Sequence, residues 1–130
     1  MTQEEKQLLL KDLCARLPYH PIVSVAYNYA DKGIVWGFDV LRIKLLLEIE
    51  EEESWEYIKP YLRPMSSMTE EEKVEYGDRC YFTLECINAN QQYYFNELYD
   101  WLNAHHFDYR GLIERGLAIA ISEDNNPYKE

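Results

Sequence analysis

The feature that most constrains the fold is a long amphipathic segment near the C-terminus, residues 90–106. On a helical projection its apolar and aromatic side chains share an arc of about 160°, and polar side chains fill the remainder. A helix with so complete a separation buries its apolar face against other parts of the protein. The residues expected on this interior face are Trp101, Tyr94, His105, Leu98, Gln91, Leu102, Phe95, His106 and Tyr99.

Between residues 20 and 59 the hydrophobic period changes to two, which is typical of half-buried β-strands. The Lys59-Pro60 pair ends this region. These signals predict an α+β fold with an antiparallel meander of three or four strands, curled enough to allow a small SH3-like barrel. The predicted strands, with turn signals between some of them, are residues 23–29, 34–38, 42–49 and 55–58.

An N-terminal helix is indicated by its capping residues. Thr2 and Glu5 have the spacing of a capping box, and Pro18 prevents the helix from continuing. We therefore predict a helix over residues 3–16. Its apolar arc includes Cys14, which we expect to pack as a small apolar side chain.

The middle of the chain contains a proline-rich connector and a second capping signal. Residues 60–65 contain two prolines and are predicted to be an extended connector. Capping-box spacing recurs within residues 67–72, so a helix should begin there and end at Gly77. Residues 80–84 are predicted to form a short strand.

Short sequence patterns predict the structure of the C-terminal region. Asp108 is a good N-cap for a short helix that ends at Gly116, and residues 117–121 either continue it or form an edge strand. Residues 122–130 are polar and are expected to be a frayed tail. In a chain of 130 residues, we therefore expect residues 1–121 to form a single α+β domain.

The amino-acid composition argues against several classes of function. The chain has 13 Lys and Arg against 24 Asp and Glu, a net charge of −11, which argues against a general nucleic-acid binder. No apolar run approaches the roughly 20 residues needed to span a membrane. The acidic N-terminus lacks the pattern of a secretory signal, and three cysteines without a C-x-x-C pair indicate neither a disulfide framework nor a zinc site. We expect a cytoplasmic protein without a cofactor.

Acidic and tyrosine residues are the candidate binding surface. A run of four glutamates follows a predicted strand, and the chain has 12 tyrosines, a residue type enriched in protein interfaces. No nucleotide-binding, nucleophile-elbow or zinc-protease motif occurs. We therefore expect a non-enzymatic binding or regulatory protein with a basic protein partner, and an edge strand with exposed tyrosines also suits a homodimer. The candidate binding residues are Glu50, Glu51, Glu52, Glu53, Tyr57, Tyr61 and Tyr93.

Two alternatives remain open at this stage. In the first, the protein is a small enzyme whose cleft contains His105, His106 and Asp108, although adjacent histidines on a helix diverge by 100° and suit a metal poorly. In the second, the small barrel binds nucleic acid through one basic face. That face would contain Arg42, Lys44, Lys59 and Arg63.

Three stretches resemble a group of small uncharacterised proteins of gut anaerobic bacteria and their phages or mobile elements. They are the opening MTQEEK, KPYLRPMSSMTEEE (residues 59–72) and WLNAHHFDYRGLIERGL (residues 101–117), about a third of the chain. The resemblance implies a bacterial or phage cytoplasm and an accessory role, and our own hypothesis within that role is a phage accessory or anti-defence factor. It transfers no catalytic residue, and the less similar strand region at residues 20–58 leaves room for a different partner specificity.

Overall fold

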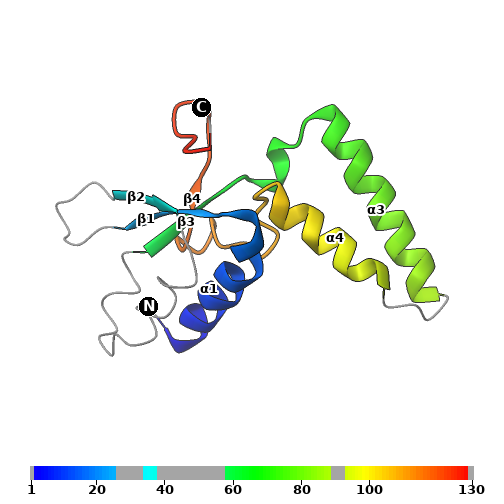
Figure 1. Cartoon of the computed structure of the whole chain (residues 1–130), viewed down its shortest axis with the longest axis horizontal. Helices are drawn as coiled ribbons and strands as arrows, with labels where there is room; N and C mark the ends of the chain where they lie inside the picture. The colour runs from blue at the N-terminus through cyan, green and yellow to red at the C-terminus, as the bar shows by residue number, and fades with distance from the viewer. Residues whose placement is uncertain (1, 26–33, 38–57, 89–92, 129–130) are drawn as a thin grey trace.

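The computed structural model describes residues 2–25, 34–37, 58–88 and 93–128 of the chain. In Figure 1 the strands lie beside the N-terminal helix, and two further helices extend together to one side of the sheet. The elements in chain order are α1 (Gln3–Arg16), η1 (Leu17–Tyr19), β1 (Ile22–Val25), β2 (Ile34–Gly37), β3 (Ile58–Leu62), η3 (Met65–Ser67), α3 (Glu70–Asn88), α4 (Tyr93–Ala104) and β4 (Ile119–Ala120).

The described strands form one open, mixed sheet in the order β2-β1-β3-β4. β1 pairs antiparallel with both β2 and β3, whereas β4 runs parallel to β3, with Tyr61 opposite Ile119. The α+β class is therefore confirmed, but these strands form neither an all-antiparallel meander nor a closed SH3-like barrel. The parallel pair arises because the chain leaves β3, passes through α3 and α4, and returns to the same sheet edge. The predicted strand at residues 42–49 lies outside the described residues.

β3 continues where the sequence predicts an extended connector. Pro60 lies inside the strand, opposite Val23, and the strand has neighbours on both sides. The prediction of a connector is wrong because the strand can accommodate Pro60. On the β4 side, pairing begins only at Tyr61, so β4 needs no N–H from Pro60. The amide of Ile121 donates to the Leu62 carbonyl at 2.8 Å, so the alternation of the backbone also directs the nitrogen of Pro60 away from β1. The missing N–H therefore interrupts no bond of the β1 ladder.

Helix α1 has the predicted bounds but buries a different side. The Glu5 amide donates to the Thr2 hydroxyl at 3.1 Å, as the capping box predicts. Leu9 and Leu13 are fully buried in the main hydrophobic core, yet Cys14 is exposed, contrary to the sequence prediction. The buried side includes instead two charged residues, Asp12 and Arg16. They can be buried because they lie one helical turn apart and form an ion pair.

Helix α3 begins as predicted and continues much further. The Glu72 amide donates to the Thr69 hydroxyl at 3.2 Å, and the Thr69 amide donates to the Glu72 carboxylate at 3.0 Å. The helix passes through Gly77 to Asn88, so both the predicted end and the predicted strand at residues 80–84 are wrong. Gly77 does not adopt the positive φ of a helix-ending glycine, and its cost inside a helix, about 1 kcal/mol, is small against packing along α4.

Helix α4 confirms the predicted aromatic helix and forms a second hydrophobic core. Trp101 and Leu102 are buried together with Phe107, whereas Tyr99 is 44% exposed and so does not belong to the interior face. Asn103, predicted on the polar side, is buried because its side-chain oxygen accepts a hydrogen bond from the Tyr109 hydroxyl at 2.9 Å. No helix in the described ranges is both long and apolar enough to cross a bilayer.

The chain after α4 is held by turns and by its last described residue. The Asp108 carboxylate accepts from the amides of Leu112 and Ile113, both at 2.9 Å, so it caps a turn rather than the predicted regular helix. Of the two alternatives predicted for residues 117–121, the structure has the edge strand, β4. In the tail, expected to be frayed, the Tyr128 hydroxyl accepts from the Ile22 amide at 2.7 Å, which ties this segment back to the sheet.

Candidate functional site

Few of the predicted binding residues can be placed on a common surface. Residues 50–53 and Tyr57 lie outside the described residues. Tyr61 is only 8% exposed, because β3 is an interior strand of the sheet. Tyr93 is the first residue of α4, at the end of the helix furthest from the strands (Figure 1). The described structure therefore does not bring the predicted acidic and tyrosine residues together.

The three residues of the enzyme hypothesis diverge. His105 faces Glu72, with Nδ1 3.5 Å from a carboxylate oxygen. His106 instead stacks on Tyr128, with ring centroids 3.9 Å apart. Asp108 directs both carboxylate oxygens to backbone amides. The described residues therefore give no cleft in which these three side chains meet, and they contain no group of three or more His, Cys, Asp or Glu side chains that could hold a metal ion.

An ion pair links the end of β3 to the start of α3. Arg63 makes a two-pronged contact with Glu72, at 2.7 and 2.6 Å, and its guanidinium lies 4.1 Å from the centroid of the Phe107 ring. The hydrogen bonds from Arg63 lower the pKa of Glu72 to about 2. Since Arg63 is held in this way, it is not available for the basic face of the nucleic-acid hypothesis, and Arg42 and Lys44 lie outside the described residues.

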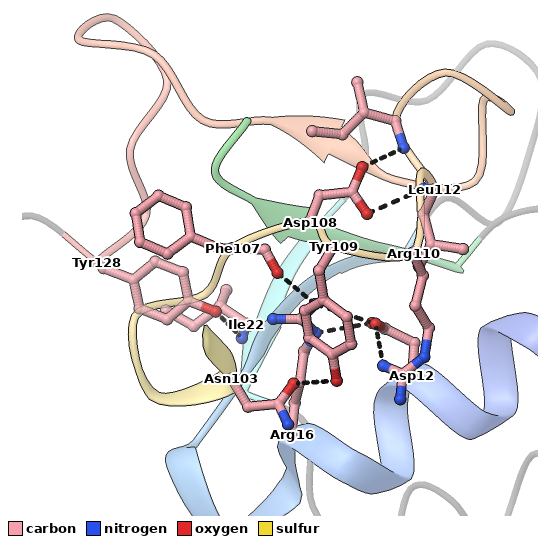
Figure 2. A network of polar contacts seen from close by, with 11 residues as sticks. Asp12, Arg16, Ile22, Asn103, Phe107, Asp108, Tyr109, Arg110, Leu112 and Tyr128 are labelled. Carbon is pink, nitrogen blue, oxygen red and sulfur yellow. Dashed lines mark hydrogen bonds and ion pairs between the residues drawn. The ribbon is translucent and has the colours of Figure 1, made fainter. Parts of the chain in front are cut away.

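A buried polar network connects α1 to the segment after α4 (Figure 2). Asp12 and Arg16 are both 0% exposed and form a two-pronged ion pair at 2.8 and 3.0 Å. Arg16 also donates to the Phe107 carbonyl at 2.6 Å, and Arg110 donates to Asp12 at 2.9 Å. The Tyr109 ring lies beside both guanidinium groups, 5.4 Å from that of Arg16 and 4.6 Å from that of Arg110. This network fastens the two parts of the chain together through charge-assisted hydrogen bonds.

This network was not predicted from the sequence. The local pattern that belongs to it is the i, i+4 spacing of Asp12 and Arg16 on α1, which usually indicates an exposed ion pair. Arg110, 98 positions away from Asp12, carries no sequence signal of its partner.

The exposed face of α3 combines apolar and acidic side chains. Val74 is 65% exposed and Tyr81 is 61% exposed. They are seven residues apart and therefore lie on one side of the helix, together with Asp78 and with Glu70, whose side chain is 91% exposed. Gly77 also lies on this side, and nothing is within 4 Å of the position where a Cβ would be. We call this surface the α3 stripe and define it as Glu70, Glu71, Val74, Gly77, Asp78 and Tyr81.

The α3 stripe lies on the most acidic part of the described structure. The sequences of α3 and α4 contain eight acidic residues and two basic residues, so these helices contribute −6 to the net charge of −11. Lys73 pairs with Glu70 at 3.1 Å, but both side chains are mostly in solvent, so the pair screens the field only weakly. Glu71 and Asp78 are exposed beside it. A basic partner would therefore be attracted to this side of the molecule.

Comparison with known proteins gives no relative from which a function could be transferred: no family model, curated protein or solved structure matches this chain.

Proposed function

We propose that this protein is a non-enzymatic binding module that uses the α3 stripe to hold a basic protein partner. The observation that carries the proposal is the exposure of Val74 and Tyr81 on the same side of a helix among carboxylates. Large apolar side chains ringed by polar groups are typical of interaction sites, and tyrosine is enriched in them. The accessory role in a phage or mobile element, implied by the resemblance, is the cellular setting that we propose.

The chemistry of the stripe specifies the partner. Val74 and Tyr81 supply two apolar contacts about two helical turns apart, which matches the spacing of anchors on an amphipathic helix. Gly77 lies between them and lets a partner backbone approach closely. Lysine or arginine side chains of the partner would face Glu70, Glu71 and Asp78. We therefore propose an amphipathic basic helix of another protein as the occupant.

A second copy of this chain is a poorer occupant. Two α3 stripes facing each other would place like charges opposite one another, which costs free energy at an interface. Self-association of the purified protein that is abolished by Val74→Asp would therefore contradict the proposal, and analytical ultracentrifugation at low and high salt measures it.

The partner can be captured from the stripe itself. A photo-crosslinking amino acid at Val74 should give an adduct that the same amino acid at Arg115, an exposed residue outside α3 and α4, does not give. The captured protein is then purified and titrated calorimetrically with the full-length chain. If the two positions give the same adducts, the α3 stripe has no specific partner and the proposal is wrong.

Matched charge variants test the mode of binding to that purified partner. The triple variant Glu70→Gln, Glu71→Gln, Asp78→Asn should weaken binding about tenfold, because each lost pair is worth about 0.2–1 kcal/mol. Added salt should reduce the difference. The control neutralises three exposed carboxylates elsewhere, Glu4, Glu114 and Glu123, and should leave the dissociation constant within about twofold. Equal effects of the two triple variants would contradict the proposal.

A further inference from the structure

Among the residues that the structure describes, two buried side-chain nitrogens lack a hydrogen-bond partner. They are Nη1 of Arg16 and Nδ1 of His106. Arg16 is fully buried, and a buried donor left without a partner costs about 1–3 kcal/mol, more when it is charged. Buried polar groups of folded proteins nearly always have a partner. The two atoms therefore require an explanation.

The two side chains belong to the same part of the interior. Nη2 of Arg16 donates to the carbonyl of Phe107, the residue that follows His106. Burial lowers the pKa of His106, the charge of Arg16 lowers it further, and Tyr128 stacks on the His106 ring. His106 has a φ of 62°, a left-handed conformation that few residues other than glycine and asparagine adopt readily. The imidazole is therefore held in place from both the backbone and the ring face.

The charge around these atoms is positive. Two guanidinium groups, those of Arg16 and Arg110, share the single carboxylate of Asp12. The Asp108 carboxylate is directed at the amides of Leu112 and Ile113, whereas both guanidinium groups contact Asp12 (Figure 2). Burial, and after it the charges of Arg16, His105 and Arg63, lower the pKa of His106 to about 4, so its imidazole is neutral at pH 7. One further negative charge would balance the two guanidinium groups.

We propose that Arg16 and His106 form an internal binding site for one small monovalent anion. Nη1 of Arg16 and the N–H of His106 Nδ1, in its neutral tautomer, are the donors, and Tyr128 covers the imidazole from one face. A halide or another anion of similar size suits a site that is enclosed by side chains. An anion is favoured over water because it satisfies both donors and also compensates the surplus positive charge.

Bromide is the probe for the test. Crystals of the full-length protein grown or soaked in sodium bromide should show an anomalous peak within hydrogen-bond distance of Arg16 Nη1. In solution at constant ionic strength, replacing gluconate by bromide should raise the urea midpoint, and bromide at ten times its dissociation constant should raise the folded-to-unfolded ratio about elevenfold. Bound bromide should also raise the pKa of His106, followed by NMR, because a nearby anion favours the imidazolium.

Two variants distinguish this site from a general salt effect. His106→Asn keeps a residue that accepts the left-handed backbone but removes the imidazole donor, so the bromide effect should be lost or greatly reduced. Arg115→Gln removes an exposed arginine and should leave the bromide effect unchanged. A bromide effect of equal size in His106→Asn, or a water in place of an anomalous peak, would overturn the proposal.

Discussion

The buried carboxylate of Asp12 gives the sharpest stability prediction. It is fully buried and accepts three hydrogen bonds from cations, at 2.8 and 3.0 Å from Arg16 and at 2.9 Å from Arg110. The substitution Asp12→Asn keeps the shape of the side chain but removes its charge and turns one acceptor into a donor. The two guanidinium groups would then lose the carboxylate that they share.

The expected loss of stability follows from this arrangement. Breaking a buried ion pair by removing one partner costs about 3–5 kcal/mol, because the remaining charge stays desolvated. The partly exposed Arg110 can turn toward solvent, but the fully buried Arg16 cannot. We therefore expect Asp12→Asn to lower the free energy of unfolding by about 4 kcal/mol. With an m-value of roughly 1.5 kcal/mol/M, the urea midpoint falls by about 2–3 M.

The assay is urea unfolding at pH 7, followed by tryptophan fluorescence, to which the buried Trp101 contributes, and by far-UV circular dichroism. Asp78→Asn is the control, because it makes the same chemical change at an exposed position and should shift the midpoint by less than about 0.3 M. Adding Arg110→Met to Asp12→Asn should recover part of the loss by removing one of the two opposed cations. A midpoint for Asp12→Asn close to that of Asp78→Asn would refute the reasoning.

Three further predictions use the same unfolding assay. Gly77→Ala should raise the free energy of unfolding by about 0.5–1 kcal/mol, because alanine restricts the unfolded backbone and its Cβ meets no atom in the helix. A lower free energy of unfolding would mean that α3 needs the glycine. Leu13→Ala should cost about 2–5 kcal/mol through a core cavity, and a cost under about 1 kcal/mol would mean that the site collapses. Because Arg63 lowers the pKa of Glu72 from 4.5 to about 2, the stability that this pair contributes is complete above pH 5 and is lost as the pH falls toward 2. The stability difference between the natural chain and Glu72→Gln should therefore shrink over that range, and a constant difference would contradict the assignment.

Local signals in the sequence predict helix starts well here. The capping residues Thr2 and Thr69 begin α1 and α3 as expected, because a cap is an interaction between residues three positions apart. The aromatic period also predicts α4. The end of α3 could not be predicted in the same way, because Gly77 terminates a helix only if the chain adopts a positive φ there, and packing along α4 decides that.

Contacts between distant segments account for most of what sequence reasoning missed. In the sequence alone, Pro60 indicates the end of a strand. Only the pairing of β3 with β1 and β4 shows that no hydrogen bond between β3 and β1 is lost. The spacing of Asp12 and Arg16 alone indicates an ordinary surface ion pair, and only the contacts with Phe107 and Arg110 show that the pair is buried. For the candidate interface, composition predicts an acidic and tyrosine-rich surface, but it does not predict that α3 extends far enough to place Tyr81 beside Val74.

The acidic residues of the α3 stripe have two different physical origins, and separating them tests the proposed function. Glu70 and Glu71 lie in the first turn of α3, where the helix dipole favours a carboxylate by about 0.3–1 kcal/mol, so folding alone explains them. Asp78 lies beyond the first turns, and there the dipole offers no such gain. Exposed Val74 gains little from folding either, because its side chain stays mostly in water.

The variants Asp78→Asn and Val74→Ala should therefore leave the urea midpoint nearly unchanged and still weaken binding of the captured partner. Val74→Ala should show the larger effect at high salt, because its contribution is apolar and is not screened. Asp78→Asn should show the larger effect at low salt, where the attraction between charges extends further. If both variants changed stability as much as binding, the α3 stripe would be part of the packing that stabilises α3 and α4, and the partner would have to bind elsewhere.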